Sequence, residues 1–380
     1  MPKPSVLFFC NFPPPYTGQT IGTEVVYRLL EGPFDTERLN TSDGALNLSR
    51  RGLARVRRAT ALLGMTRRLV RQLRRVRPQV LYIVPSTSWA GILRDTVYVV
   101  RARSRVGRIV AHVRSGELHE KYSSVWLRPL TRALVERIDA FLFLSSELSA
   151  RSSGCIPRHK HFVVPNTIDE DLRLTDEEVE AKLRARSVRD ELRVIYVGNL
   201  IPSKGYMDLV RSIPFYLAGS RVPIVVELVG SWISPQDRLR FERFVDEKGL
   251  AAHVRTFGPL SNRKAIKQLL QDADVLVLPT YYPVEAQPRS IIEAMNAATP
   301  IVATAHASIP DYVHDDINGY LVGRESPQEI ARALIRLTDS VEWEKKARAA
   351  RRTYEREFGP EMVTSKLVAA ILGQRGSAVQ

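Results

Sequence analysis

The sequence predicts an α/β protein with two Rossmann-like domains, and three observations support that prediction. Short runs rich in Val, Ile and Leu alternate with longer helical stretches along most of the chain. Most of these runs are apolar throughout, which is typical of parallel strands buried on both faces of a sheet. A polar segment without a strand pattern, residues 169–190, separates the runs into two series. A chain of 380 residues is also long enough for about two or three domains.

The two series of strands set the expected domain limits. The first series is expected at residues 5–10, 79–84, 108–113, 140–144 and 161–164. The second series is expected at residues 193–197, 224–229, 254–257, 274–278 and 301–304. We therefore expect an N-terminal domain at residues 1–170 and a C-terminal domain at residues 190–350, joined by residues 169–190 as a connection with some helix. The tail at residues 355–372 is predicted to be helical and able to pack on either domain.

Cysteine usage and hydropathy point to a cellular compartment. Cys10 and Cys155 are far apart and form neither a disulfide framework nor a zinc-ligand spacing, so a reducing compartment is expected. The apolar run that ends at Cys10 is too short for a signal peptide. No window approaches the roughly 18 apolar residues of a membrane span. We expect a cytoplasmic protein that is not integral to a membrane.

Positive charge is concentrated in one segment. Lys and Arg exceed Asp and Glu by 56 − 41 = 15, and the segment between Asp43 and Asp95 has twelve arginines and no acidic residue. Apolar residues recur near helical spacing from Leu53 to Val76, so the arginines are expected on one face of an amphipathic helix. The arginines chosen as a candidate membrane or acceptor patch are Arg67, Arg68, Arg71, Arg74 and Arg75.

The partner of this basic helix is expected to be anionic. Lipid headgroups, nucleic acid and a phosphorylated substrate all fit the charge, and a core helix with a solvated face is the simpler alternative. Nucleic acid is disfavoured, because no reading motif is present and no aromatic residues alternate with the arginines. We expect peripheral contact with the inner face of a membrane, or an anionic acceptor.

A glycine-containing turn in the second half of the chain is typical of a phosphate site. The segment Tyr196–Gly205 follows a predicted strand and precedes a helix expected near Met207. Gly198 and Gly205 permit close backbone approach and positive φ. Free N–H groups at the helix start and the charge of Lys204 suit a diphosphate at the carboxyl edge of a parallel sheet. An ordinary strand-to-helix turn with a solvated lysine is the alternative.

A pair of glutamates forms the second candidate. Glu285 is expected in the loop before a helix and Glu293 on that helix, with Pro288 in its first turn. The rise of a helix separates the two carboxylates by on the order of 10 Å, which spans the distance from a sugar across a diphosphate to a ribose. Carboxylates accept hydrogen bonds from vicinal hydroxyls, so both positions suit glutamate. A helix-capping acid and a surface acid would show the same spacing.

These segments together resemble a known family. Residues 285–322, EAQPRSIIEAMNAATPIVATAHASIPDYVHDDINGYLV, resemble the donor-site block of glycosyltransferase family 4 (group 1), in which two glutamates are separated by seven residues. Residues 198–205, GNLIPSKG, resemble its phosphate loop, and residues 11–18, NFPPPYTG, resemble its N-terminal loop. The resemblance is specific over residues 193–340 and looser before them. It implies the GT-B fold, with two parallel sheets facing across a cleft and the C-terminal helix returning to the N-terminal domain.

The resemblance also assigns site residues. It implies that Glu285 contacts the donor sugar, Glu293 the ribose and Lys204 the phosphates. Gly18 would allow close approach of the N-terminal loop. The remaining candidate donor-binding residues are Gly198, Asn199 and Ser290.

Two positions depart from the family pattern. The family's phosphate-loop arginine falls on the neutral Asn199, and its active-site histidine falls on Arg114. His112 occupies the earlier histidine position and is expected to point to the other side of the strand. Arg114 is a candidate to supply the charge missing at Asn199.

No metal or cofactor is expected. Asp272 and Asp274 are better explained as the polar start of a buried strand, and the histidines lack ligand spacing. The resemblance implies a retaining, metal-independent transferase that uses a UDP- or GDP-sugar as co-substrate. The expected acceptor is a lipid-linked or polysaccharide glycan in cell-surface glycan biosynthesis. Two alternatives are a catalytically impaired GT-B partner subunit and an arginine-driven polyanion-binding protein.

Overall fold

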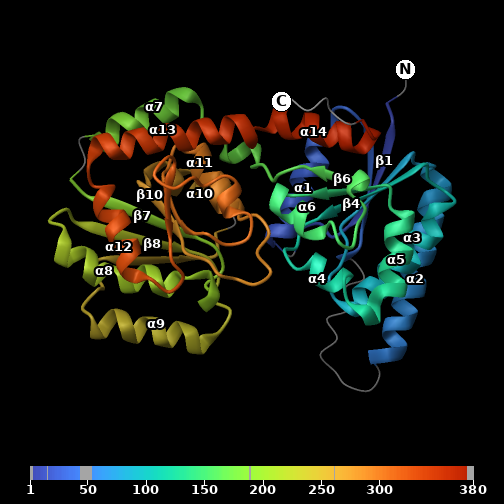
Figure 1. Cartoon of the computed structure of the whole chain (residues 1–380), viewed down its shortest axis with the longest axis horizontal. Helices are drawn as coiled ribbons and strands as arrows, with labels where there is room; N and C mark the ends of the chain where they lie inside the picture. Colours follow the sequence, from blue (N-terminus) through green and yellow to red (C-terminus); the bar gives the residue numbers. More distant parts are fainter. Residues whose placement is uncertain (1–2, 15, 43–53, 188–189, 261, 375–380) are drawn as a thin grey trace. The chain divides into compact units, whose positions relative to one another are not determined.

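The protein folds into two compact units, each built on one parallel sheet (Figure 1). The computed structural model describes residues 3–14, 16–42, 54–187, 190–260 and 262–374. Unit 1 comprises Met1–Asn166 and Pro360–Gln380, and unit 2 comprises Thr167–Gly359. The predicted fold class, two α/β domains with parallel sheets, is confirmed.

The sheet of unit 1 has the order β2-β1-β3-β4-β5-β6, with every neighbouring pair parallel. Its strands are β1 (Ser5–Cys10), β2 (Asp35–Asn40), β3 (Val80–Ile83), β4 (Arg108–Val113), β5 (Ala140–Phe143) and β6 (His161–Val163). The polar edge strand β2, DTERLN, has no fully buried residue and no apolar pattern. That is why the sequence analysis did not predict it.

The helices of unit 1 lie on both faces of this sheet. They are α1 (Gly18–Glu31), α2 (Ala54–Val76), α3 (Trp89–Arg103), α4 (Leu118–Tyr122), α5 (Arg128–Arg137), α6 (Ser146–Ser152) and α14 (Pro360–Leu372), with 3-10 turns η2 (Val125–Leu127) and η3 (Arg158–Lys160). The chain moves from β1 to β2 in one direction and from β2 towards β5 in the other. Right-handed crossovers therefore place α1 on one face and α2, α3 and α5 on the opposite face.

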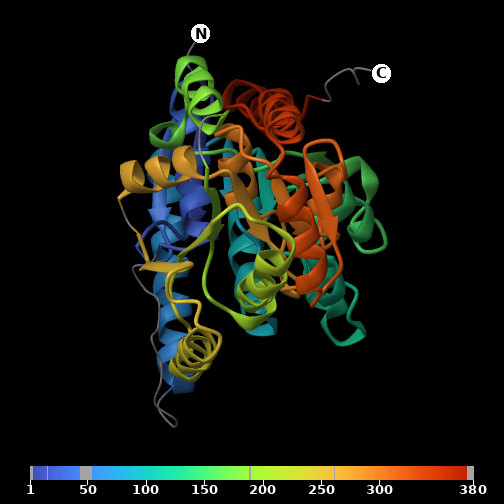
Figure 2. The same ribbon diagram turned by 90° about the vertical axis from the view of Figure 1, so that its left-hand side faces the viewer.

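Packing contacts agree with this division. Helix α1 packs against α14, whereas α3 packs against both α2 and α5. The longest helix of unit 1, α2, continues well past the ends of the strands, as Figures 1 and 2 show in blue.

The C-terminal tail divides between the two units. The predicted helix at residues 355–372 is interrupted at Phe358 and Gly359, where α13 (Ser340–Glu357) ends and α14 begins. Val363 and Leu367 of α14 are buried in the core of unit 1. Among the described residues, no helix has the length and apolar character needed to cross a membrane.

The sheet of unit 2 has the order β12-β11-β10-β7-β8-β9 and is also parallel. Its strands are β7 (Leu192–Val197), β8 (Ile224–Val229), β9 (Val254–Gly258), β10 (Val275–Leu278), β11 (Ile301–Thr304) and β12 (Gly319–Val322). Its other elements are η4 (Glu170–Leu172), α7 (Asp176–Ser187), η5 (Pro202–Lys204), α8 (Tyr206–Gly219), α9 (Pro235–Glu247), α10 (Arg263–Asp272), α11 (Arg289–Asn296), η6 (Ile309–Asp311), α12 (Pro327–Arg336) and α13. Strand β12, at the edge next to β11, was not predicted.

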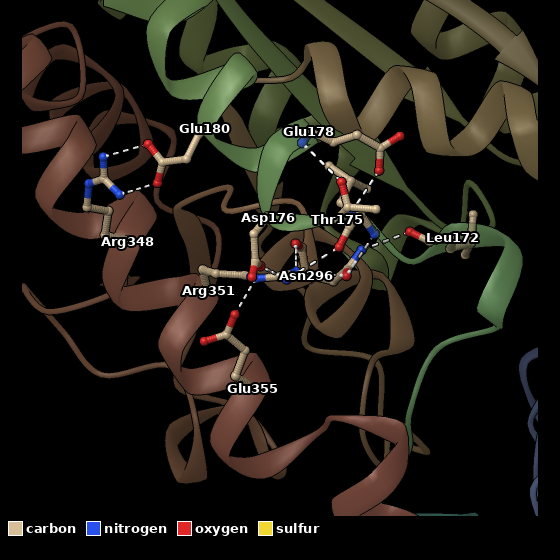
Figure 3. Close-up of polar contacts among 10 residues, drawn as sticks. Leu172, Thr175, Asp176, Glu178, Glu180, Asn296, Arg348, Arg351 and Glu355 are labelled. Atoms are coloured by element: carbon tan, nitrogen blue, oxygen red, sulfur yellow. Dashed lines mark hydrogen bonds and ion pairs between the residues drawn. The ribbon is translucent and has the colours of Figure 1, made fainter.

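The segment at residues 169–190, predicted as a connection between the domains, forms part of unit 2. Lys182 of α7 is buried and donates hydrogen bonds to the main-chain carbonyls of Leu270 and Ala297. Asn296 at the end of α11 donates to the Leu172 carbonyl over 2.8 Å, and Arg351 of α13 donates to the Asn296 carbonyl over 2.7 Å (Figure 3). Arg351 also donates to the Leu174 carbonyl and to Asp176, so these bonds together attach the polar segment to α10, α11 and α13.

Candidate active site

The loop between β7 and α8 brings Lys204 to the carboxyl edge of the unit 2 sheet. Gly205 has φ of +79°, and a Cβ atom there would lie 2.3 Å from the carbonyl oxygen of Pro279. Both the backbone conformation and the close approach therefore require glycine at this position. Gly198 does not adopt the positive φ that glycine permits. Instead Gly230, with φ of +156°, approaches the Gly198 carbonyl so closely that a Cβ would lie 1.9 Å from its oxygen.

Lys204 and Glu285 meet at this edge. The Lys204 Nζ atom lies 3.2 Å from Glu285 Oε2 and 5.3 Å from the centre of the Tyr282 ring. Glu285 is 9% exposed, and its loop is closed by a hydrogen bond from its own N–H to the Tyr282 carbonyl. Glu285 Oε2 is buried and has no hydrogen bond of good geometry within the described part of the chain. The ion pair is therefore its main electrostatic contact, and the carboxylate can still accept hydrogen bonds from a ligand.

Two helices of unit 2 begin near these residues without a side-chain cap. Helix α8 starts after Gly205 and α11 starts after Pro288, and neither of these N-cap residues makes a side-chain cap hydrogen bond. Pro288 thus precedes the helix and is not in its first turn, where it was predicted. Helix starts of this kind present main-chain N–H groups and the positive end of the helix dipole to an anion. Ser290 is the second residue of α11 and is 9% exposed.

Glu293 lies one turn further along α11 in a buried charge cluster. Its Oε1 atom is 3.8 Å from Arg289 Nη2, which is itself 3.7 Å from Asp169 Oδ2. Arg263 also pairs closely with Asp169. Burial raises the pKa of Glu293 above that of an ordinary glutamate, while Arg289 and Arg263 counteract part of that rise. The sequence analysis identified Glu293 but not the two arginines or Asp169 beside it.

Asn199 is exposed on the same loop and contributes no charge. Its main-chain carbonyl accepts a hydrogen bond from the Tyr196 hydroxyl over 3.0 Å. This contact ties the loop to β7, because the ring of Tyr196 is fully buried. Lys204 is therefore the cation that the loop itself presents.

In unit 1, Arg114 follows β4 and is held by neutral oxygen atoms. Its Nη1 atom donates to Asn166 Oδ1 and its Nη2 atom to the Gly22 carbonyl, both over 3.0 Å. A Cβ atom on Gly22 would lie 2.3 Å from Arg114 Nη1, so α1 approaches the guanidinium closely only because residue 22 is glycine. Within the part of the chain that the structure describes, Arg114 makes no ion pair with a carboxylate. Its charge is thus fixed in position and not neutralised.

His112 points towards Arg114, which corrects the prediction that the two side chains point to opposite sides. Residues two apart on a strand share a face, and Arg114 Nη2 lies 3.5 Å from His112 Nδ1. The Tyr82 hydroxyl lies 2.6 Å from the same nitrogen. Burial and the nearby guanidinium hold the pKa of His112 well below its usual value, so the ring is neutral. Burial also raises the pKa of Cys10 and of Tyr82.

Three residues of this cluster, Tyr82, Gly22 and Asn166, were not singled out from the sequence. They lie in β3, in α1 and after β6, and no local pattern connects them. The predicted Gly18 is the first residue of α1, where a Cβ would meet no atom within 4 Å. Thr17 caps this helix through a reciprocal pair of hydrogen bonds with Thr20.

The arginines of α2 form an exposed row, as the amphipathic pattern predicted. Leu69 and Leu73 are buried against unit 1, and the side chains of all five candidate arginines are exposed. Those arginines are Arg67, Arg68, Arg71, Arg74 and Arg75. Arg75 pairs with Glu37 of β2 over 3.0 Å. The arginines at 50 and 51, and the side chains of those at 55, 57 and 58, lie outside the described residues.

Asp274 has a structural role at the start of β10. Its Oδ2 atom accepts a hydrogen bond from the Arg193 main-chain N–H, and its Oδ1 atom pairs with the buried Arg186. Among the residues that the structure describes, no group of three or more His, Cys, Asp or Glu side chains is arranged to hold a metal ion.

Comparisons with known proteins relate the sequence of unit 2 to a family. The sequence model of the family "Glycosyl transferases group 1" matches residues 179–356. The D-inositol 3-phosphate glycosyltransferase of Streptomyces griseus is 30% identical over 192 residues, which is 49% of this chain and 40% of that protein. An uncharacterized glycosyltransferase of Methanocaldococcus jannaschii is 29% identical over 181 residues, 46% of this chain and 44% of that protein. The chain matches less than half the length of these relatives.

Solved structures resemble the whole chain. HepE of Anabaena, in complex with UDP and glucose, superposes with a TM-score of 0.72 and 16% identity over 97% of this chain and 99% of that one. The sucrose-phosphate synthase of Thermosynechococcus elongatus superposes with a TM-score of 0.72 and 18% identity over 96% and 98%. At these identities the likeness concerns the fold alone. Residues 179–356, most of unit 2, therefore match the glycosyl transferases group 1 family, and the whole chain has the GT-B fold of these solved structures.

Proposed function

We propose that the protein transfers a sugar from a nucleotide-diphosphate sugar and that unit 2 binds this donor. The observation that carries the proposal is the Lys204–Glu285 pair beside two uncapped helix starts. A diphosphate needs a cation and free N–H groups, while a sugar needs a carboxylate acceptor, and this edge of the sheet supplies all of them. UDP bound to HepE of Anabaena supports a uridine nucleotide, with GDP as the alternative.

Each candidate residue has a proposed role. Lys204 and the N–H groups at the start of α8 bind the diphosphate, together with Gly198, Asn199 and Gly205 of the same loop. Ser290 donates a hydrogen bond to the diphosphate from the start of α11. Glu285 accepts hydrogen bonds from sugar hydroxyls, and Glu293 accepts them from the ribose. Gly18 keeps the N-terminal loop small enough to approach the donor.

We infer transfer with retention of anomeric configuration and without a metal ion. In this mechanism the leaving diphosphate accumulates negative charge, which Lys204 and the helix starts stabilise. The donor phosphate accepts the proton of the acceptor hydroxyl as the new glycosidic bond forms on the same face. Arg114 of unit 1 is proposed to stabilise negative charge in the same way. It is a fixed cation that pairs with no carboxylate among the described residues.

We propose an anionic or lipid-linked acceptor, used in cell-surface glycan synthesis. The exposed row of arginines on α2 supports this, since it adds positive charge to unit 1 without a matching row of acids. The name of the relatives from Streptomyces griseus and Mycobacterium bovis, D-inositol 3-phosphate glycosyltransferase, contains a phosphorylated compound, which supports an anionic acceptor. We further propose that the protein acts in the cytoplasm, at the inner face of a membrane, where each arginine near an anionic leaflet contributes about 1 kcal/mol.

A donor-binding experiment tests the central proposal. The melting temperature of the purified chain is measured with a panel of UDP- and GDP-sugars and the free nucleotides, because a ligand bound to the folded state raises stability by mass action. We expect one nucleotide class to raise it and Lys204→Ala to abolish the shift. No shift with any nucleotide sugar would contradict the proposal. A shift without donor hydrolysis or transfer would favour an impaired partner subunit, the first alternative.

A vesicle experiment tests the role of the arginines. Arg75 is left unchanged because it pairs with Glu37. The variant changes Arg67, Arg68, Arg71 and Arg74 to Gln. A matched control removes four exposed arginines of unit 2 that make no ion pair with a described residue: Arg221, Arg243, Arg324 and Arg352. We expect the first variant to lose binding to anionic vesicles at low salt while the control retains it. Equal binding by both would argue against this surface, and displacement of nucleotide sugar by nucleic acid would favour a polyanion binder.

A further inference from the structure

Helix α3 of unit 1 exposes an apolar stripe on its outer side. Trp89, Leu93 and Val100 are 68%, 40% and 44% exposed, and Val97 is partly exposed. At about 100° per residue, these positions fall within roughly a quarter of the helix circumference. The opposite side of α3 is buried against the sheet. The helix is therefore apolar on both sides, although only one of them contacts the core.

A second apolar group lies in the turn before α5. Trp126 is 93% exposed and Val125 is 76% exposed, both within η2. The Arg128 N–H donates to the Val125 carbonyl, and the nearby Tyr122 side chain is buried. The Thr131 hydroxyl also donates to the Tyr122 carbonyl over 3.3 Å. A packed turn thus presents the Trp126 ring to solvent.

The two apolar groups lie on neighbouring elements of unit 1. Helix α3 follows β3, and η2 with α5 follows β4, the parallel neighbour of β3. Helix α3 packs against both α5 and α2. Trp89 starts α3 directly after β3, whereas Trp126 lies after α4 and just before α5, the helix that leads into β5.

Positive charge surrounds the apolar stripe. On α3 itself, Arg101 lies beside the stripe, while Arg94 is paired with the buried Asp95. Arg132 of α5 is paired with Glu136. The exposed arginines around the stripe that make no ion pair with a described residue are Arg67, Arg68, Arg71, Arg74, Arg101, Arg105 and Arg128. An apolar centre with a cationic border is the pattern of a surface that lies in the interface of an anionic bilayer.

We propose that the outer face of α2, α3 and α5 docks on an anionic lipid bilayer, with the α3 stripe and the Val125–Trp126 turn inserted among the headgroups. The proposal rests on the membrane contact proposed above and names the residues that enter the lipid. Tryptophan is favoured at the boundary between headgroups and acyl chains. The stripe has no carboxylate or amide to bind sugar hydroxyls, so a lipid surface fits it better than a glycan. The arginines contact lipid phosphates.

Tryptophan fluorescence tests insertion directly. The full chain is mixed with anionic phosphatidylglycerol vesicles whose acyl chains carry bromine, which quenches only indole rings that reach the acyl region. Trp343 is buried and Trp232 is partly buried, and both lie in unit 2. We expect strong quenching for the native chain and little for a variant with Trp89→Phe and Trp126→Phe. Binding to vesicles without quenching would overturn the proposal and leave the arginine contact intact.

A charge placed on the stripe tests the same proposal through affinity. We expect the variant Leu93→Asp, Val100→Asp to bind anionic vesicles about tenfold or more weakly, because a carboxylate resists entry into the interface. The control is Val341→Asp, at a position of α13 in unit 2 that is 77% exposed, and we expect it to bind as the native chain does. Unchanged binding by the stripe variant would refute insertion.

Two further measurements separate the possible failures. If the native chain binds no anionic vesicles, both insertion and the proposed membrane contact are wrong. If the native chain is a dimer in solution that Leu93→Asp dissociates, a second copy covers the stripe and the lipid proposal is overturned. Nucleotide-sugar binding is measured on every variant, since its retention shows that unit 2 is intact, whereas its absence from the native chain would contradict only the proposed transferase function.

Discussion

Lys204 Nζ lies 3.2 Å from Glu285 Oε2, which joins the loop after β7 to the loop after β10. Both loops leave the carboxyl edge of the sheet, because β7 and β10 are parallel neighbours. The pair explains how a lysine and a glutamate far apart in the sequence act at one place. The ion pair holds the Lys204 side chain beside the start of α8 and places the Glu285 carboxylate at the same edge of the sheet.

Removing the lysine is expected to reduce turnover by about 10²–10³, the usual effect of deleting one group that stabilises developing charge. Lys204→Ala also leaves Glu285 without its cation, so affinity for the anionic donor falls as well. Turnover and UDP affinity are measured together, with Lys248→Ala, an exposed lysine after α9, as the control. Native turnover in Lys204→Ala would remove this residue from the proposed mechanism.

The two glutamates are expected to act on different parts of the donor. Glu285→Gln should lower the rate of sugar transfer and leave the affinity for free UDP nearly unchanged. Glu293→Gln should weaken UDP itself, because the proposed partner of Glu293 is the ribose. Titration calorimetry with UDP and initial rates with the sugar donor separate the two effects. If both variants lose UDP affinity equally, the division between sugar and ribose is wrong.

The raised pKa of Glu293 predicts the pH dependence of nucleotide binding. An ionised carboxylate accepts ribose hydrogen bonds on both oxygens, whereas protonation turns one oxygen into a donor and weakens the other as an acceptor. Glu293 takes up its proton at a higher pH than an ordinary glutamate. UDP affinity should therefore fall as the pH is lowered towards the raised pKa, while Glu293→Gln should show no such fall. UDP titrations over a series of mildly acidic pH values would detect the difference.

Gly22→Ala is expected to displace Arg114, since the new Cβ would lie 2.3 Å from Nη1. We expect a loss of turnover similar to that of Arg114→Met, about 10²-fold, with UDP affinity preserved. The combined variant should lose little more than either single variant, because both changes remove the same interaction. Gly32→Ala is the control, because its Cβ would meet nothing within 4 Å. Additive losses would show that Gly22 does not act through Arg114.

His112 is expected to make unit 1 less stable in acid. In the unfolded chain its ring takes up a proton below about pH 6.5, whereas the folded state keeps it neutral. Unfolding therefore binds a proton, and the free energy of unfolding falls by up to about 1.4 kcal/mol per pH unit as pH decreases below 6.5. His112→Asn retains an acceptor for the Tyr82 hydroxyl, and its free energy of unfolding should lack this decrease below pH 6.5. Parallel urea-unfolding profiles for both proteins between neutral and acidic pH would contradict the prediction.

Asn296 is expected to hold α7 and η4 onto unit 2. It donates to the Leu172 carbonyl, accepts from the Leu174 N–H and receives a hydrogen bond from Arg351 (Figure 3). Asn296→Ala leaves buried main-chain groups without partners and should destabilise unit 2 by about 1–3 kcal/mol. Limited proteolysis should then cleave near residues 170–187 sooner than in the native protein. Unchanged cleavage would mean that Lys182 and the apolar contacts are enough to hold α7 and η4 onto unit 2 without Asn296.

Local pattern in the sequence predicted ten of the twelve described strands, the fold class, and the loop or helix on which Lys204, Glu285 and Glu293 lie. Continuous apolar runs identify buried parallel strands because burial on both faces leaves no polar alternation. The arginine row on α2 was also predictable, since helical spacing alone places those side chains opposite Leu69 and Leu73.

Only the tertiary structure decided which distant groups meet. Gly22, Tyr82 and Asn166 surround Arg114 because the sheet brings β3, β4 and the end of β6 together with α1, and no short-range signal records that meeting. The edge strand β2 forms through backbone hydrogen bonds, which depend little on its polar side chains. The apolar stripe of α3 has the composition of a core helix, and its exposure followed only from which side α3 turns to the sheet. Periodicity records that a residue is apolar, whereas the packing of neighbouring elements determines whether water, protein or lipid covers it.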